Sequence, residues 1–375
     1  MRDRTIIRKV MMLTSDILIA ALLVAMIWGV NYLIPQTGIR AQAMAETAGS
    51  AGSGTSSAAD SVTDSRASIS SADLTAETKR LQNLADSSAN GLPTTKVSLD
   101  TQDWHQKFAD KFTDKVVSTD TSYTSPNLSI QLTYDSYMTN RLDDSENGRH
   151  QKYGTNVSYV LADIYVGDIT CLQTCFAQDT YGIGYSEKLQ DMSQRIQAVL
   201  AVNGDSYSNS RHENNGTIIR NGVIYRTKPT DMETCVLNWD GTMEIYQPQD
   251  LNIQQLIDSG AYQSWIFGPS LLDENGKAKT SFMTWDYIRE SHPRTAIGYY
   301  EPGHYCLLVV DGRQDSSRGM FPEEMAALFE QLGCKAAYNL DGGHCSFMEM
   351  QGRTANHPYK PDHEVQDGIF ITEGL

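Results

Sequence analysis

Residues 305–341 read YCLLVVDGRQDSSRGMFPEEMAALFEQLGCKAAYNLD, and this stretch decides the fold. It begins with Tyr305–Val310, an apolar run of strand length that ends in Asp-Gly. Pro322 suits the first turn of a helix, and Gly333 provides a stop at its end. One face of the predicted helix is apolar and carries Met325, Leu328, Phe329 and Leu332. Ala336–Leu340 predicts a second strand, so the stretch forms one β-loop-α-β unit.

Strand patterns dominate the sequence on the N-terminal side of this unit. Apolar and polar residues alternate at 128–134 and 157–166, which is typical of half-buried strands. The other predicted strands are 198–202, 216–219, 223–225, 234–237, 242–245, 265–267 and 295–300. Helical periodicity is rarer. We therefore predict the α+β (mixed α/β) class, with one strand-rich catalytic domain over residues 101–375.

Two carboxylates stand out because each follows a predicted strand of the β-loop-α-β unit. Asp311 and Asp341 both belong to Asp-Gly pairs at strand ends. We expect them to emerge at the same edge of neighbouring strands. Two carboxyl groups a few ångströms apart can divide acid, base or nucleophile roles in glycoside hydrolysis. The alternative interpretation is that each Asp-Gly pair is an ordinary turn.

Residues near these carboxylates could bind a phosphorylated sugar. Gly342 and Gly343 leave room for a ligand to approach the backbone. Arg294 and Arg313 can recognise phosphate oxygens with a planar guanidinium fork. His344 is a candidate for proton transfer. Alternatively, Arg294 forms a surface ion pair and His344 supports its neighbours by hydrogen bonding.

The charge of the chain limits its partners. The net charge is −16 and 40% of the residues are hydrophobic. This composition supports a buried core and argues against nucleic-acid binding through a general basic surface. A phosphate-bearing substrate would need a local cationic pocket. The six cysteines lack the paired spacing of a zinc ribbon, so buried thiols or one or two disulfides are expected.

The N-terminal region predicts the compartment. Residues 1–16 carry a basic flank, and 17–35 contain an apolar run long enough to cross a bilayer. The flank predicts a cytoplasmic N-terminus, a single-pass anchor and an extracytoplasmic catalytic domain at the cell surface. A cleaved signal peptide is the alternative, because Ala41-Gln42-Ala43 has the form of a cleavage site. Residues 36–100 form a linker rich in Ser, Ala and Thr, with a possible short helix at 72–87.

Several motifs in order resemble the phosphodiester glycosidase family. They are AVNGDSY (201–207), GTIIRNGVIY (216–225), IFGPSLLDENGKA (266–278), HPRTAIGY (292–299) and the segment 307–346. The resemblance implies a hydrolase that acts on a sugar-1-phosphodiester. Bacterial relatives are similar in having a membrane anchor and a linker, and some are described as exopolysaccharide-related. The substrate implied is a phosphate-linked, GlcNAc-like glycan of the cell envelope, or a molecule like a nucleotide sugar.

The resemblance also implies particular site positions. The substrate-binding and catalytic positions are Asn203, Arg294, Asp311, Arg313, Asp341, Gly342, Gly343 and Ser346, and Gly268 of the 266–278 motif is a further candidate for substrate binding. Asp205 and His344 depart from the family pattern, since relatives have small residues there. Asp205 could therefore add a charge or a ligand at the substrate site.

A mechanism follows from the chemistry of the implied substrate. Phosphate is a weakly basic leaving group, so neutralising its charge matters more than protonating the leaving oxygen. Arg294 and Arg313 would hold the phosphate. Asp341 would act as nucleophile or as the base that activates water, while Asp311 orients sugar hydroxyls or assists proton transfer. No cofactor is certain.

Two other functions remain open from the sequence. Asp205, Asp311 and Asp341 are hard oxygen donors that suit calcium or magnesium, which would allow a metal-dependent phosphodiesterase that attacks phosphorus. The other possibility is a non-catalytic module that binds phosphate-linked envelope glycans. The anchor and linker are compatible with either alternative.

Overall fold

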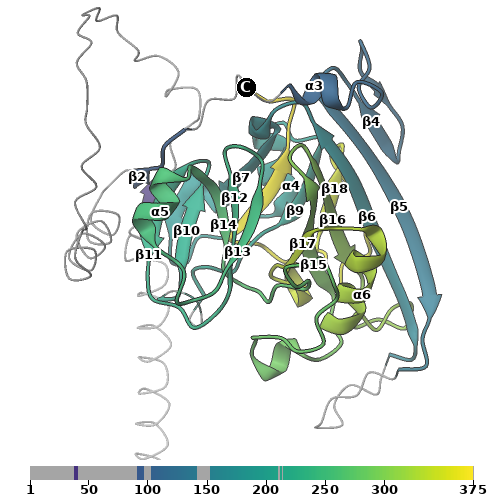
Figure 1. Cartoon of the computed structure of the whole chain (residues 1–375). Helices are drawn as coiled ribbons and strands as arrows, with labels where there is room; N and C mark the ends of the chain where they lie inside the picture. Colours follow the sequence, from purple (N-terminus) through teal and green to yellow (C-terminus); the bar gives the residue numbers. More distant parts are fainter. Residues whose placement is uncertain are drawn as a thin grey trace, which may run out of the picture. The chain divides into compact units, whose positions relative to one another are not determined.

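The computed structural model describes residues 38–40, 91–96, 103–141, 153–209, 212 and 214–374. The predicted membrane anchor at 17–35, the short helix at 72–87 and most of the linker lie outside these residues. In the described part of the chain, no helix has the length and apolar character required to cross a membrane. Figure 1 follows the described chain through its strands and helices.

The largest sheet has seven strands in the order β17-β15-β16-β6-β5-β4-β3. Its members are β3 (Val117–Ser118), β4 (Ser122–Thr124), β5 (Leu128–Met138), β6 (Asn156–Val166), β15 (Arg294–Glu301), β16 (His304–Val310) and β17 (Ala336–Asn339). All neighbours are antiparallel. The long strands β5 and β6 pair over their whole length and extend beyond the rest of the sheet (Figure 1).

A second sheet has five antiparallel strands in the order β19-β18-β9-β20-β7. They are β7 (Leu172–Phe176), β9 (Leu200–Asn203), β18 (Met348–Met350), β19 (Arg353–Thr354) and β20 (Asp367–Ile371). Strand β9 lies in its centre although it comes earlier in the chain than β18 and β20.

Two three-stranded sheets complete the larger structure, with the orders β10-β11-β2 and β13-β12-β14. Their strands are β2 (Leu92–Pro93), β10 (Thr217–Arg220), β11 (Val223–Thr227), β12 (Thr234–Asn238), β13 (Met243–Tyr246) and β14 (Ala261–Trp265). The remaining described strands are β1 (Gly38–Arg40) and β8 (Thr180–Gly182).

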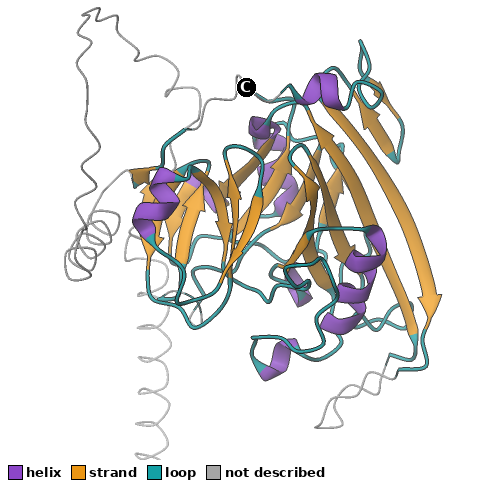
Figure 2. Ribbon diagram, viewed as in Figure 1, coloured by secondary structure: helices purple, strands orange, loops and turns teal. Residues whose placement is uncertain are grey.

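Helices are few and short in the described residues, and they lie outside the sheets (Figure 2). The α-helices are α3 (Trp104–Lys107), α4 (Leu189–Arg195), α5 (Ile253–Asp258) and α6 (Pro322–Leu332). Short 3-10 helices occupy Ile169–Cys171, Ala177–Asp179, Asp286–Ile288 and Gly343–Cys345. The prediction of a strand-rich domain is confirmed.

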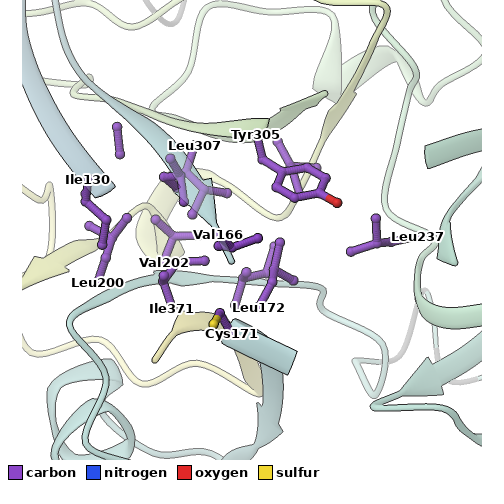
Figure 3. Close-up of a cluster of buried hydrophobic side chains, with 14 of the residues drawn as sticks. Ile130, Val166, Cys171, Leu172, Leu200, Val202, Leu237, Tyr305, Leu307 and Ile371 are labelled. Carbon is purple, nitrogen blue, oxygen red and sulfur yellow. The ribbon is translucent and has the colours of Figure 1, made fainter. Parts of the chain in front are cut away.

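The main core lies between the seven-stranded and five-stranded sheets. Ile130 and Leu307 come from the first sheet, while Leu200, Val202 and Ile371 come from the second (Figure 3). These side chains are almost completely buried. Because side chains alternate between the two faces of a strand, β5 buries every second residue from Leu128 to Leu132.

Helix α6 covers the opposite face of the seven-stranded sheet. Met325, Ala326 and Phe329 are buried against the sheet residues of a second hydrophobic cluster. The helix begins after Phe321 and ends at Gly333, whose φ of 82° suits a residue without a Cβ atom. The helix predicted after Phe321 is therefore confirmed, together with its apolar face.

Two expectations about strands are corrected. Strands β16 and β17 are not neighbours, because β15 lies between them and pairs antiparallel with both. The strand predicted at 265–267 instead occupies Ala261–Trp265. Ile266 and Phe267, which were predicted to belong to this strand, donate their N–H groups to the carboxylate of Asp205 at 2.9 and 3.1 Å rather than to a neighbouring strand.

All six cysteines are free, and all but Cys345 are buried. The sulfur atoms of Cys306 and Cys334 lie 3.8 Å apart beneath α6. The structure therefore favours buried thiols over the alternative of disulfides. Burial raises the pKa of Cys306 well above its ordinary value, which is typical of an unreactive core thiol.

Candidate active site

The two Asp-Gly turns meet at the segment that precedes β15. A Cβ atom added to Gly312 would lie 2.6 Å from the nitrogen of Pro293, and one added to Gly342 would lie 2.7 Å from its carbonyl oxygen. Gly343 also donates its N–H to that carbonyl at 2.9 Å. The glycines are required because both loops approach the same stretch of backbone. This contact brings the ends of β16 and β17 together across the start of β15.

Asp341 is a half-buried carboxyl group at this junction. Its Oδ1 accepts a hydrogen bond from the Gly342 N–H at 2.9 Å, and the thiol of Cys345 donates to the same carboxylate. Burial raises the pKa of Asp341 from 3.8 to about 6, and these two hydrogen bonds oppose the rise. A carboxyl group that titrates near neutral pH can exchange protons during a reaction.

Arg313 supplies a cation beside the Gly342-Gly343 turn. A Cβ atom on Gly343 would lie 3.2 Å from Arg313 Nη1, so the guanidinium lies against the turn. Its Nη2 donates to His292 Nδ1 at 3.3 Å, and its guanidinium carbon lies 5.6 Å from the ring centre of Tyr359. Among the described residues, Arg313 makes no ion pair and its buried Nε has no hydrogen-bond partner. Such a donor is suited to an anionic ligand.

His344 stacks on the same aromatic ring. Its imidazole is nearly parallel to the Tyr359 ring, with the two centres 5.4 Å apart. Burial, followed by the positive charge of Arg313, lowers the pKa of His344 to about 4. His344 is therefore neutral at physiological pH and can exchange hydrogen bonds without adding a charge.

Arg294 is buried and turned toward the backbone. Its Nε donates to the Met320 carbonyl at 3.0 Å, and its Nη2 donates to the carbonyls of Ile288 and Glu290. Burial and the nearby guanidinium of Arg313 lower the pKa of Arg294 to about 9. These contacts hold the loop before β15 in place. The charge of Arg294 adds to the positive potential felt at Arg313.

Asp311 does not form a carboxylate pair with Asp341. Its Oδ1 accepts from Asn356 Nδ2 at 3.1 Å and from the His357 N–H at 2.8 Å. Its Oδ2 lies 3.3 Å from Ser158 Oγ and 3.2 Å from His357 Nδ1. Only 3% of Asp311 is exposed. With these four contacts, Asp311 fixes the loop after β19 beside the end of β16.

Asn203 and Ser346 connect the site to the five-stranded sheet. Asn203 Nδ2 donates to the carbonyl of Asp341 at 2.6 Å, and its Oδ1 accepts from Thr295 Oγ1 at 2.6 Å. The carbonyl of Ser346 accepts a hydrogen bond from Asn356 Nδ2 at 3.1 Å, whereas the buried hydroxyl of Ser346 has no partner among the described residues. Asn203 therefore positions Asp341, and Ser346 leaves a hydroxyl group uncommitted.

Asp205 belongs to a buried charge cluster below the site. Its N–H donates to Asp367 Oδ1 at 2.6 Å, and Arg220 contacts both carboxylates. Burial raises the pKa of Asp205 to about 7, although Arg220 opposes the rise. Asp367 also contributes to the raised pKa of Asp341. The structure thus places Asp205 in the core, where its carboxylate binds backbone N–H groups.

Gly268 lies away from the two Asp-Gly turns, near the end of β17. Its φ is 68°, and its carbonyl accepts a hydrogen bond from Asn339 Nδ2 at 2.7 Å. A Cβ atom there would lie 3.2 Å from the hydroxyl of Tyr338. Within the described residues, no group of three or more His, Cys, Asp or Glu side chains could hold a metal ion.

Sequence reasoning missed the loop that follows β19. Asn356, His357 and Tyr359 contact Asp311, Ser346, Arg313 or His344, yet they lie beyond the last motif considered. The available signal was the polar run Asn-His-Pro-Tyr at 356–359, in the loop between β19 and β20. Asp367 also precedes a glycine, but it was missed because it stands at the start of a strand rather than at its end.

Comparison with known proteins identifies the class. Residues 197–372, which include both Asp-Gly turns and the loop after β19, match the model of the phosphodiester glycosidase family. This segment is a little under half of the chain, and over it the chain is similar to the phosphodiester glycosidases.

Among individual relatives, the chain is 32% identical over 193 residues to the SPbeta prophage-derived uncharacterized protein YomE of Bacillus subtilis (strain 168). The match covers 50% of this chain and 29% of YomE, so the chain spans less than a third of that relative.

Two solved structures are also similar. The zebrafish N-acetylglucosamine-1-phosphodiester alpha-N-acetylglucosaminidase catalytic domain matches with a TM-score of 0.49 and 18% identity, over 66% of this chain and 89% of that one. A hypothetical protein from Synechocystis matches with a TM-score of 0.47 and 12% identity, over 66% of this chain and 62% of that one.

Proposed function

We propose that the domain hydrolyses a glycosyl phosphodiester by attack at the anomeric carbon. One observation carries this proposal. Asp341 has a pKa of about 6 and stands two residues before Gly343, where an added Cβ atom would lie 3.2 Å from Arg313 Nη1. A proton-exchanging carboxyl group and a cation without a carboxylate partner thus share one turn. The match of residues 197–372 to the model of the phosphodiester glycosidase family supports the same reaction class.

Arg313 binds the phosphate in this proposal. Its Nε and Nη atoms can donate a fork of charge-assisted hydrogen bonds to two phosphate oxygens, each worth about 1.5–3 kcal/mol. The neighbouring Arg294 supports the positive potential, although its Nε and Nη2 atoms donate to backbone carbonyls. The hydroxyl of Ser346 is available to a sugar hydroxyl or a phosphate oxygen, whereas the N–H groups of Gly342 and Gly343 already donate to Asp341 and Pro293. These roles follow from the donors that have no partner among the described residues.

Asp341 acts as the base in the chemical step. A water oxygen forms a bond to the anomeric carbon while the bond from that carbon to the phosphate oxygen breaks. The electron pair of the broken bond leaves with the phosphate, and the water proton passes to Asp341. Phosphate leaves as a monoester without prior protonation, so a second acidic residue is unnecessary. A base mechanism predicts inversion at the anomeric carbon, and retention would assign Asp341 as a nucleophile.

The position of an oxygen label tests this proposal. The full-length chain, purified in detergent, is incubated with UDP-N-acetylglucosamine in water enriched in oxygen-18, and the products are analysed by mass spectrometry. We expect the label in the free sugar. Label in the phosphate would refute attack at carbon and favour a phosphodiesterase, especially if a chelator abolished turnover. Tight binding without turnover, unchanged in Asp341→Asn, would instead support a binding module.

Two variants make the test specific. Asp341→Asn should reduce turnover at least 1,000-fold, on the order of 4 kcal/mol of transition-state stabilisation. Asp362→Asn is the matched control, because this carboxylate is 93% exposed and, within the described part of the chain, forms its ion pair with Lys188. The control should retain the wild-type rate.

We also propose that residues 17–35 anchor the chain and that the domain lies outside the cytoplasm. The apolar run and its basic flank support this location. Protease added to intact cells that express the full chain should remove the domain. Digestion that occurs only after lysis would contradict the proposed orientation.

A further inference from the structure

A groove begins beside Asp311 and follows the seam between the seven-stranded sheet and the β18–β19 hairpin. Its first part is a cavity of about 470 Å³, within the range of about 300–1,000 Å³ that is typical of ligand sites. Asp311, Ser316 and His357 line its end nearest the candidate active site. Residues 134–136 of β5 and 158–160 of β6 form its floor.

A second cavity of about 520 Å³ continues the groove away from the site. It is lined by residues 118–120, which follow β3, and by residues 350–355 of the β18–β19 hairpin. Tyr134 lines both cavities, so they adjoin at this residue. The groove thus leads from Arg353, across Tyr134, to His357 and the start of the Asp311–Arg313 turn.

The groove exists because β5 extends past the core. Ile130 and Leu132 on its inner face are buried between the sheets, but Tyr134, on the same face, is 50% exposed. After Leu132 the strand continues to Met138, whereas the five-stranded sheet no longer covers it. A large aromatic side chain is therefore left uncovered inside a polar channel. Isolated exposed aromatic residues are common, but one that joins two cavities has the position of a binding platform.

The groove has the chemistry of a site for uncharged sugars. Tyr134 can stack on the apolar face of a pyranose ring. Hydroxyl and amide groups surround it and can exchange hydrogen bonds with sugar hydroxyls; they come from Ser118, Thr119, Ser136, Ser158, Gln351 and Thr354. The charged lining residues include Asp120, Asp135 and Asp311, while Arg353 is paired with Asp120 at 2.9 Å. This acidic balance disfavours a polyanion.

We propose that this groove binds neutral sugar residues of the glycan to which the scissile phosphodiester is attached. The proposal rests on the proposed function of the neighbouring site and defines its substrate class as a phosphodiester on a neutral oligosaccharide. Among the described residues, Arg353 of the groove is paired with Asp120, whereas Arg313 at the adjoining turn makes no ion pair, so one phosphate is held at Arg313 while the uncharged chain occupies the groove. Gln314 joins the two regions, since its Nε2 donates to the His357 carbonyl at 2.7 Å.

Calorimetric titration of the full-length chain in detergent tests this proposal. The probes are maltohexaose, chitohexaose and a dextran oligosaccharide, with oligogalacturonate as the anionic comparison. We expect at least one neutral probe to bind and Tyr134→Ala to weaken it about tenfold, which corresponds to about 1.4 kcal/mol. Tyr134→Phe should retain binding because it keeps the ring. Tyr137→Ala is the matched control, as this residue lines neither cavity and points to the other face.

The outcomes separate the groove from the active site. Turnover of UDP-N-acetylglucosamine should be unchanged in Tyr134→Ala, since that small substrate does not reach Tyr134. Binding of a neutral sugar by a wild-type chain that shows no turnover would support the groove and refute the proposed activity. Turnover without binding of any neutral probe, or tighter binding of oligogalacturonate, would overturn the groove proposal. If Tyr134→Ala fails to fold, Arg353→Ala replaces it, because that side chain is 78% exposed.

Discussion

Replacement of Asp341 by Asn is expected to stabilise the folded protein above pH 6 while it removes activity. Burial raises the pKa of this carboxyl group from 3.8 to about 6. The folded state therefore holds the proton more tightly than the unfolded chain between these pH values. Stability contributed by this group is present at low pH and is lost as the pH rises through about 6. Asn carries no charge, so it avoids this loss.

The magnitude follows from the size of the pKa change. Each pH unit corresponds to about 1.4 kcal/mol, so the rise in pKa from 3.8 to about 6 sets an upper bound of about 3 kcal/mol. Part of this gain is offset, because an amide accepts the Gly342 and Cys345 hydrogen bonds less well, at about 1 kcal/mol. We expect Asp341→Asn to increase the free energy of unfolding by about 1–2 kcal/mol at pH 8. The melting temperature should rise by roughly 2–8 °C.

Urea unfolding monitored by circular dichroism at pH 8 and at pH 4 measures this effect. The stabilisation should be present at pH 8 and absent or reversed at pH 4, where Asp341 is largely protonated in the folded protein. An equal free-energy difference at both pH values would refute the reasoning, because it would show that ionisation of Asp341 is not the cause. Asp362→Asn is the exposed control and should show no difference at either pH.

Three further predictions concern the same loops. The kcat/KM for glycosyl phosphodiester hydrolysis should rise with pH through about 6 as Asp341 ionises, and a rate that falls over this range would contradict its role as base. Arg313→Lys should lower kcat/KM about 10- to 100-fold without unfolding the chain, since Lys keeps the charge but loses the planar guanidinium fork. An unchanged kcat/KM would show that Arg313 does not bind the phosphate. Asp311→Asn should lower the free energy of unfolding in urea by about 2–4 kcal/mol, because an amide nitrogen would face the donors that contact the carboxylate of Asp311. Wild-type stability of this variant would show that these four contacts contribute little.

Local patterns in the sequence were sufficient for the elements around the site. The apolar face of α6, its proline start and its glycine end are short-range features, and each appears in the structure at the predicted residues. The same holds for β16 and β17, whose Asp-Gly ends could be read directly. Likewise, the positions of Arg313 and Asp341 at loop ends follow from residue order alone.

The arrangement of these elements could not be read in the same way. Strand β15 lies between β16 and β17, so the expected neighbours are separated by one strand. Asp311 is held by Asn356 and His357, which follow it by 45 and 46 residues. Because these partners hold the Asp311 carboxylate, it does not form the predicted pair with Asp341. Hydrophobic periodicity reports which face of a strand is buried but not which strand lies beside it.

Residue order alone is sufficient for the family motifs, for the helix and strands of the β-loop-α-β unit and for naming candidate site residues. The contacts that these residues make depend on the folded chain. The hydrogen bond from Asn203 to Asp341 spans 138 positions, and the one from Asp205 to Asp367 spans 162. Contacts between such distant residues determine which side chains are buried. Burial raises the pKa of Asp341 and of Asp205, and it places the Asp205 carboxylate where it accepts backbone hydrogen bonds. Turn and helix signals act over a few residues, whereas the free energy of a buried charge depends on everything packed around it.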